Sequence, residues 1–238
     1  MNTLYITGAG VSAESGIPTF RGQDGYWTIG SVNYTPQEMA TRHMYQTNPL
    51  EFLRWYYHRF ATYRNHGANE VHHWLADKNL ITQNIDGLDA KAGNKNYIAV
   101  HGRLDQMTSF HHQGDDVEII ETPWNKVQTE NLDESLLNLF RIENRPKVNF
   151  SYKPLVLLFD EYYTELYRIS EAQQRMVDAD RIIFIGTSFS VNITQMALDI
   201  AQSQNTPIEV VDPNPVEVAY QNVIYHPMKA SQYIKENA

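Results

Sequence analysis

Residues 6–22 read Ile-Thr-Gly-Ala-Gly-Val-Ser-Ala-Glu-Ser-Gly-Ile-Pro-Thr-Phe-Arg-Gly, and this stretch decides the fold. A short apolar run, Leu4–Thr7, leads into three small residues, Gly8, Ala9 and Gly10, where a helix could start. Unpaired backbone N–H groups and the positive end of the helix dipole converge at such a turn, so a pyrophosphate can be held there with few side chains. The pattern is typical of a dinucleotide-binding fold, although its spacing is not G-x-G-x-x-G, and an ordinary tight turn is the alternative reading.

The residues after this turn supply polar and aromatic side chains. Ser12 and Glu14 can bond to the start of the helix, and Gly16-Ile17-Pro18 ends that helix early. Phe20 and Arg21 follow on a loop bounded by proline and glycine. A ring and a guanidinium beside a phosphate site could cover a ligand and hold an anion, whereas a core Phe and a surface Arg are the plainer interpretation.

The composition predicts a globular protein with one substantial core, or with one large and one small domain. The chain has 238 residues, of which 42% are apolar and 12% aromatic. No stretch approaches the ~20 apolar residues of a membrane span, and the N-terminus runs into a strand without a basic segment or cleavage site. We therefore expect no membrane partner and a cytoplasmic location.

Charge and cysteine content argue against several classes of function. The formal charge of −9 argues against general nucleic-acid binding and is compatible with attraction of Lys-rich peptides. The chain contains no cysteine, which excludes disulfides, thiolate nucleophiles and sulfur-ligated metal sites together.

A second apolar run ends in amide and carboxylate side chains. Leu80–Thr82 reads as a buried strand and is followed by Gln83, Asn84 and Asp86. Open α/β sheets bind ligands at the carboxyl ends of their strands, which is where these groups lie. Without further information, Asn84 and Asp86 could instead be turn formers.

Two further strands end in residues that suit a cleft. His101 follows the predicted strand Tyr97–Val100, and its unperturbed pKa of ~6.5 makes a histidine usable as a base near neutral pH. A single histidine is more often structural, and that alternative stays open at this point. The buried strand Arg181–Ile185 leads into the small-residue turn Gly186-Thr187-Ser188.

Five segments resemble, in the family's order, the motifs of the sirtuins, which are NAD-dependent protein deacylases. They are the opening turn with Phe20-Arg21, the Gln83–Asp86 segment, His101, the Pro154–Glu161 segment, and Gly186–Val191. The resemblance implies NAD as cofactor and an acylated lysine on a peptide or protein as substrate.

The same resemblance implies roles for individual residues. His101 would be the catalytic base, Asn84 would bond the nicotinamide ribose or position water, and Asp86 would hold the nicotinamide carboxamide. Phe20 would shield the reactive ribose. The implied cofactor-binding residues are Gly8, Ala9, Gly10, Ser12, Ala13, Glu14, Phe20, Arg21, Gln83, Gly186, Thr187, Ser188, Asp212 and Ala230.

A substrate side of the cleft is implied as well. The segment ending in Phe159-Asp160-Glu161 resembles one whose edge pairs with the substrate backbone, and Val191 would lie toward the acyl-lysine. Tyr56 and Arg59 stand at i and i+3 of a predicted helix and resemble a pair that holds the carboxylate of malonyl or succinyl groups. Aromatic packing with a solvated Arg is the alternative for this pair.

The resemblance fails over Arg103–Tyr152. Sirtuins usually have a zinc ribbon here with two Cys-x-x-Cys pairs, and this chain has no cysteine to supply them. His111, His112, Asp115 and Asp116 could suggest a substitute site, but no second cluster follows at zinc spacing, so we expect no metal. We expect the segment to hold itself together by packing against the main domain.

Three single positions also depart from the family's pattern. Asp160 replaces a glycine, which need not abolish strand addition because that binding uses main-chain bonds. Asp212 stands where the family commonly has Asn on the adenosine ribose, and a carboxylate that accepts ribose hydroxyls is chemically reasonable. Asp89 stands where many sirtuins have His.

We predict an α/β fold: a doubly wound, Rossmann-like parallel sheet with a smaller inserted lobe. The Rossmann-like domain is assigned to residues 1–30, 68–102 and 154–238. The lobe comprises a mostly helical insertion that closes over the cofactor, 31–67, and the cysteine-free segment 103–153.

Two other functions remain open on the sequence alone. NAD hydrolysis or ADP-ribosyl transfer without lysine deacylation is supported by the Asp160 substitution and the missing ribbon. A non-catalytic module that binds NAD or ADP-ribose is opposed by Asn84, Asp86 and His101, which are all present. The sequence predicts neither the acyl group nor the oligomeric state.

Overall fold

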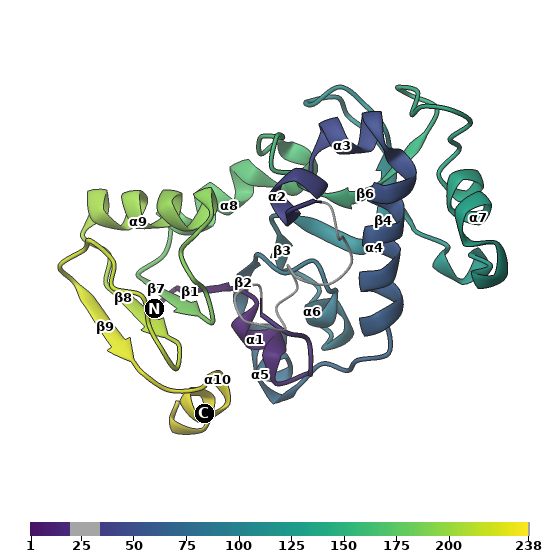
Figure 1. The fold of residues 1–238 in the computed structure, drawn as a ribbon. Helices are drawn as coiled ribbons and strands as arrows, with labels where there is room; N and C mark the ends of the chain where they lie inside the picture. The colour runs from purple at the N-terminus through teal and green to yellow at the C-terminus, as the bar shows by residue number, and fades with distance from the viewer. Residues whose placement is uncertain (20–33, 238) are drawn as a thin grey trace.

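The computed structural model describes residues 1–19 and 34–237. Its larger sheet has six strands in the order β3-β2-β1-β7-β8-β9, and every neighbouring pair is parallel (Figure 1). The strands are β1 (Thr3–Thr7), β2 (Asn79–Thr82), β3 (Ile98–Ala99), β7 (Arg181–Ile185), β8 (Ile208–Val211) and β9 (Val223–His226). This order, which reverses between β1 and β7, is the doubly wound arrangement that the sequence predicted.

Helices cover both faces of the sheet because alternate strand residues point to opposite sides. Leu4 and Ile6 pack with α8 and α9, while Tyr5 packs with α5 and α10. The helices of this domain are α1 (Gly10–Ala13), α5 (Glu70–Trp74), α6 (Leu88–Lys91), α8 (Ile169–Val177), α9 (Asn192–Gln204) and α10 (Ala230–Glu236), with short 3-10 turns at Leu75–Asp77 and Glu165–Tyr167.

A smaller lobe lies beside this domain, with α4 standing between the main sheet and α7 in Figure 1. Its antiparallel sheet has the order β5-β4-β6. The elements of the lobe are α2 (Pro36–Met39), α3 (Arg42–Thr47), α4 (Pro49–Tyr63), β4 (Gly102–Ser109), β5 (Ile119–Glu121), α7 (Leu132–Leu139) and β6 (Tyr152–Val156), with 3-10 turns at Trp124–Lys126 and Thr129–Asn131. Because β6 pairs with β4, residues 154–156 belong to the lobe's sheet, whereas the sequence analysis placed them in the main domain.

Aromatic packing fills the lobe. Trp124 stacks on Phe60 of α4 with ring centroids 5.1 Å apart, contacts Phe140, and donates its indole N–H to the Leu104 carbonyl at 2.9 Å. The cysteine-free segment is therefore held by α4 of the helical insertion, and it also contacts the main domain as expected, where the Leu104 N–H donates to the Ile85 carbonyl at 2.9 Å. The described residues contain no group of three or more metal-ligating side chains and no helix long and apolar enough to cross a membrane.

Candidate active site

Three strands bring the predicted motifs together. Thr7 at the end of β1 is in register with Thr82 of β2 and with Ile185 of β7. The residues that follow these three strands therefore meet at one edge of the sheet, where α/β folds bind their ligands.

The two small-residue turns at this edge touch through their backbones. The Gly10 N–H donates to the Gly186 carbonyl at 2.9 Å, and the Gly8 N–H donates to the Ile185 carbonyl at 3.0 Å. A Cβ on Gly10 would lie 2.6 Å from the Gly186 Cα, and Gly186 itself has a φ of +63°. No side chain fits between the two turns. A phosphate that approaches them therefore meets backbone atoms and not side chains.

Ser12 connects the Gly8–Gly10 turn to the Gln83–Asp86 segment. Its hydroxyl donates to Asp86 Oδ2 at 2.6 Å and accepts from Asn84 Nδ2 at 3.2 Å. Asn84 Nδ2 also donates to the Gly8 carbonyl at 3.0 Å. Both amide hydrogens of Asn84 are thereby used, so its carbonyl oxygen is the group left to accept a hydroxyl.

The His72 ring contacts the Ser12 hydroxyl, which the sequence analysis did not predict. His72 Nδ1 accepts the Asn69 N–H at 3.3 Å, so Nε2 carries the proton and faces the Ser12 hydroxyl at 3.5 Å. Burial lowers the pKa of His72 to about 4, with a smaller contribution from His73. The buried histidine is neutral at pH 7, and the Asn69 side chain caps α5 by accepting the Val71 and His72 N–H groups.

Asp86 and Asp89, which is on α6, are carboxyl groups close enough to influence each other's charge. Asp86 accepts from Ser12 and from the Leu88 N–H at 2.9 Å, and burial nevertheless raises its pKa. Burial and then the neighbouring Asp86 raise the pKa of Asp89 to about 7. Since a carboxylate has about four acceptor positions, Asp86 retains room for an amide N–H of a ligand.

His101 lies at the same edge with both ring nitrogens bonded. Nδ1 bonds to the Gln83 carbonyl at 2.9 Å, and Nε2 bonds to the Tyr163 hydroxyl at 2.9 Å. Burial lowers the pKa of His101 to about 4, a shift only partly offset by the Gln83 bond. A carbonyl only accepts, so neutral His101 has its proton on Nδ1 and its lone pair on Nε2, the form that a general base requires.

The remaining residues of the predicted cofactor site follow the same edge. Gln83 Nε2 donates to Thr187 Oγ1 at 3.1 Å, and Glu14 accepts from the Ser231 hydroxyl at 2.9 Å, next to Ala230 at the start of α10. Asp212 follows β8 and accepts the Asn214 N–H at 2.8 Å. Ala9 precedes α1, Ala13 ends it, and exposed Ser188 bonds to Ser190. Phe20 and Arg21 lie outside the described residues.

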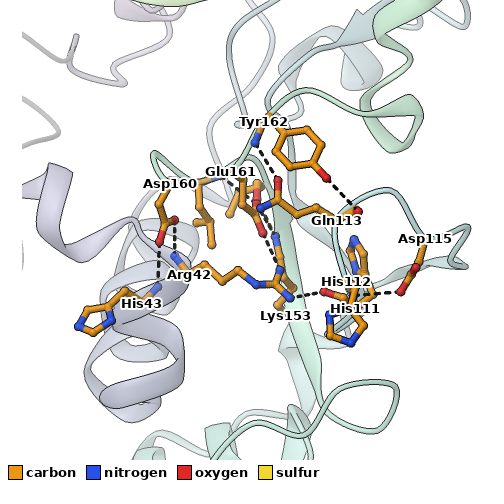
Figure 2. A network of polar contacts seen from close by, with 12 residues as sticks. Arg42, His43, His111, His112, Gln113, Asp115, Lys153, Asp160, Glu161 and Tyr162 are labelled. Atoms are coloured by element: carbon orange, nitrogen blue, oxygen red, sulfur yellow. Dashed lines mark hydrogen bonds and ion pairs between the residues drawn. The ribbon is translucent and has the colours of Figure 1, made fainter.

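The predicted substrate segment is anchored by a polar network (Figure 2). Glu161 is buried, bonding to Arg42 at 3.0 Å and to the fully buried Lys153 at 3.2 Å. Its side chain is therefore committed inside the protein, and its main-chain N–H donates to the Leu158 carbonyl at 2.9 Å. Phe159 is 52% exposed beside it, and Val191 is half-buried at the start of α9.

Asp160, which replaces the family's glycine, caps a helix. Its two carboxylate oxygens accept the N–H groups of Arg42 at 2.6 Å and His43 at 3.0 Å, which are the first residues of α3 (Figure 2). Free N–H groups at a helix start are stabilised by an acceptor, and an anion suits the helix dipole. The substitution thus joins the substrate segment to the helical insertion.

Tyr56 and Arg59 lie together inside the small lobe. Arg59 is 2% exposed, donates to the Trp55 carbonyl at 3.0 Å, and stacks its guanidinium on the Trp55 ring. Tyr56 is buried against Phe52 and Trp55. The pair shares one helix face as predicted, and the solvated Arg of the alternative reading is ruled out by this burial.

The sheet order, the close contact of Gly8 and Gly10 with Gly186, and a neutral histidine define a Rossmann-type enzyme with a base at the carboxyl edge of its sheet. The chain belongs to the Sir2 family, whose model matches residues 8–193.

Relatives and solved structures agree with this membership. The chain is 31% identical over 240 residues to NAD-dependent protein deacylase 1 of Caldanaerobacter subterraneus subsp. tengcongensis, covering 97% of this chain and 90% of the relative. It is 29% identical to NAD-dependent protein deacylase of Leptospira interrogans, covering 87% and 80%. A Sir2 homologue in complex with NAD superposes with a TM-score of 0.73 at 28% identity, covering 99% of this chain and 87% of that one.

Proposed function

We propose that this protein is an NAD-dependent deacylase that removes an acyl group from lysine side chains of a peptide or protein. NAD supplies the ribose carbon that receives the acyl oxygen, with nicotinamide as the leaving group. The observation that carries the proposal is the neutral His101 at the carboxyl edge of the sheet, whose Nδ1 bonds to the carbonyl of Gln83 in the segment that also carries Asn84 and Asp86. The relatives named as NAD-dependent protein deacylases support it.

The residues of the cleft suit the parts of NAD. The close approach of Gly8, Gly10 and Gly186 leaves main chain for the pyrophosphate, and Asp212 offers a carboxylate to a ribose hydroxyl. Asp86 can accept from the nicotinamide amide, and the Asn84 carbonyl can accept from a ribose hydroxyl. His101 is the base that gains a proton when a ribose hydroxyl is deprotonated.

We infer that acetyl-lysine is preferred over succinyl-lysine. A succinyl group carries a carboxylate that needs a cation, and Arg59 is the predicted partner. Its guanidinium is instead stacked on Trp55 and bonded to the Trp55 carbonyl within the lobe's core, so reaching an acyl carboxylate would cost both contacts.

Nicotinamide release from NAD tests the function and the acyl preference together. We expect release to depend on added peptide, with kcat/KM for an acetyl-lysine peptide at least about tenfold above that for a succinyl-lysine peptide, a difference of ~1.4 kcal/mol. Arg59→Met should lower the melting temperature and leave this ratio unchanged. A succinyl preference that Arg59→Met abolishes would contradict the inference.

Hydrolysis of NAD without peptide is the second candidate. The Tyr162 N–H donates to Gln113 Oε1 at 2.8 Å, and the Leu158 N–H donates to Glu161 Oε2 at 3.1 Å, so two donors of the substrate segment already have partners (Figure 2). A peptide that added as a strand at those groups would have to displace them. Release at equal rates with and without peptide would favour this candidate over deacylation.

A further inference from the structure

Tyr163 brings a hydroxyl onto the base from a segment far away in the sequence. It follows the substrate segment after β6, and its ring stacks on the His101 ring with centroids 5.9 Å apart and planes 24° apart. Its hydroxyl lies 2.9 Å from His101 Nε2. No motif in the sequence singled out this residue.

The direction of this hydrogen bond follows from the other side of the ring. His101 Nδ1 donates to the Gln83 carbonyl, so Nε2 of the neutral imidazole has only a lone pair. The Tyr163 O–H must therefore donate to Nε2. An imidazole nitrogen has one in-plane lone pair, and in this structure the Tyr163 proton occupies it.

Tyr163 is fixed in this position from several sides. Its ring packs against the core of the main domain, which includes Ile193 and Ala197 of α9. The preceding residue, Tyr162, is tied to Gln113 through its N–H and its hydroxyl. Moving Tyr163 away from His101 would break its hydroxyl bond and unpack its ring, so we treat it as part of the fixed site.

We propose that Tyr163 relays the proton from the ribose hydroxyl of NAD to His101. The ribose O–H bond breaks as a new O–H bond forms on the Tyr163 oxygen, while the original Tyr163 proton moves to Nε2 of His101. Tyr163 stays neutral, His101 becomes the imidazolium, and the ribose oxygen becomes the nucleophile. A tyrosine oxygen has acceptor positions besides its O–H, so it can take the ribose hydroxyl while its own proton points at His101.

The relay rests on the proposed deacylation and deepens it. Burial raises the pKa of Tyr163 to about 12, which agrees with a hydroxyl that passes a proton on and never carries a negative charge. Departure of nicotinamide and attack by the acyl oxygen break no O–H bond. The relay therefore acts only after that first step, and the two steps can be measured separately.

Tyr163→Phe removes the hydroxyl and keeps the ring. We expect it to lower kcat for O-acyl-ADP-ribose formation by about 100-fold, within the range of general acid–base catalysis. Exchange of labelled nicotinamide into NAD in the presence of acetyl-lysine peptide should stay within about threefold of the wild type. On a His101→Ala background the same substitution should change the rate by less than about threefold, because two residues of one relay act as a unit.

Tyr220→Phe is the matched control, since Tyr220 also bonds through its hydroxyl, to the Ala201 and Thr206 carbonyls. Wild-type rates from Tyr163→Phe, or faster ones, would overturn the relay, as would a loss that includes the exchange step or adds to that of His101→Ala. A wild-type protein that gives neither exchange nor acyl product would overturn the proposed function, and the relay with it.

Discussion

Alanine in place of His101 is expected to lower the rate of O-acyl-ADP-ribose formation by about 10³-fold, while nicotinamide exchange continues. The imidazole is the group at the cleft edge whose lone pair is directed at a hydroxyl, and alanine leaves that proton without an acceptor. Product formation is measured by chromatography, and exchange by incorporation of labelled nicotinamide.

His73→Ala is the control for this variant, because His73 is exposed on α5 and outside the cleft. We expect it to retain wild-type rates. Equal product formation by His101→Ala and His73→Ala would show that another group is the base.

The pKa of His101 sets the pH below which this residue is protonated and can no longer act as the base. Because burial lowers the pKa of His101 to about 4, the active neutral form persists below the ordinary value of ~6.5. The acid limb of kcat/KM that belongs to His101 should therefore fall near pH 4. For stability the sign is the same: the unfolded chain binds this proton more readily, so the free energy of unfolding decreases as pH falls from ~6.5 toward 4, for His72 as well.

Gly186→Ala is expected to have the largest effect on the folded protein. Its φ of +63° disfavours any Cβ by ~1 kcal/mol, and the Cβ would in addition lie 2.7 Å from the Gly10 Cα and from the Val11 nitrogen. Those neighbours are main chain, so they cannot give way as a flexible side chain can. We expect the free energy of unfolding to fall by about 4 kcal/mol and NAD affinity by about 100-fold or more.

Two glycine variants separate the causes of that loss. Gly93→Ala has a φ of +95° with no atom within 4 Å, so it carries the backbone cost alone. Gly10→Ala has no positive φ and meets the Gly186 Cα at 2.6 Å, so it carries the clash alone. Chemical denaturation should give a small loss for Gly93→Ala and a large one for Gly10→Ala. A Gly186→Ala protein as stable as Gly93→Ala would show that the two turns are not in contact.

The parts of the fold that could be predicted are those fixed by local pattern. Arg181–Ile185 and Ile208–Val211 are short, mainly apolar runs interrupted only by Arg181 and Glu209, and they form the central strands β7 and β8. Val223–His226 was not predicted as a strand because β9 is a half-exposed edge strand without a buried apolar run. Its strand conformation comes from pairing with β8.

The existence of a small lobe was predicted, but its packing could not be, because its contacts are between distant residues. Trp124 has no local pattern that points to Phe60, and the carboxyl group of Asp160 finds its donors at the start of α3, 117 and 118 residues earlier. The same holds for the site. Motifs brought His101, Asn84 and Asp86 into one proposal, whereas Tyr163 and the contact of His72 with Ser12 arise only from the folded chain.

The measurement that tests the account most directly is the mass of the product that wild-type protein forms from NAD and an acetyl-lysine peptide. The account predicts O-acetyl-ADP-ribose in equal amount to free lysine peptide and nicotinamide. Free ADP-ribose beside a peptide that is still acetylated would contradict it, because NAD would then be cleaved without acyl transfer.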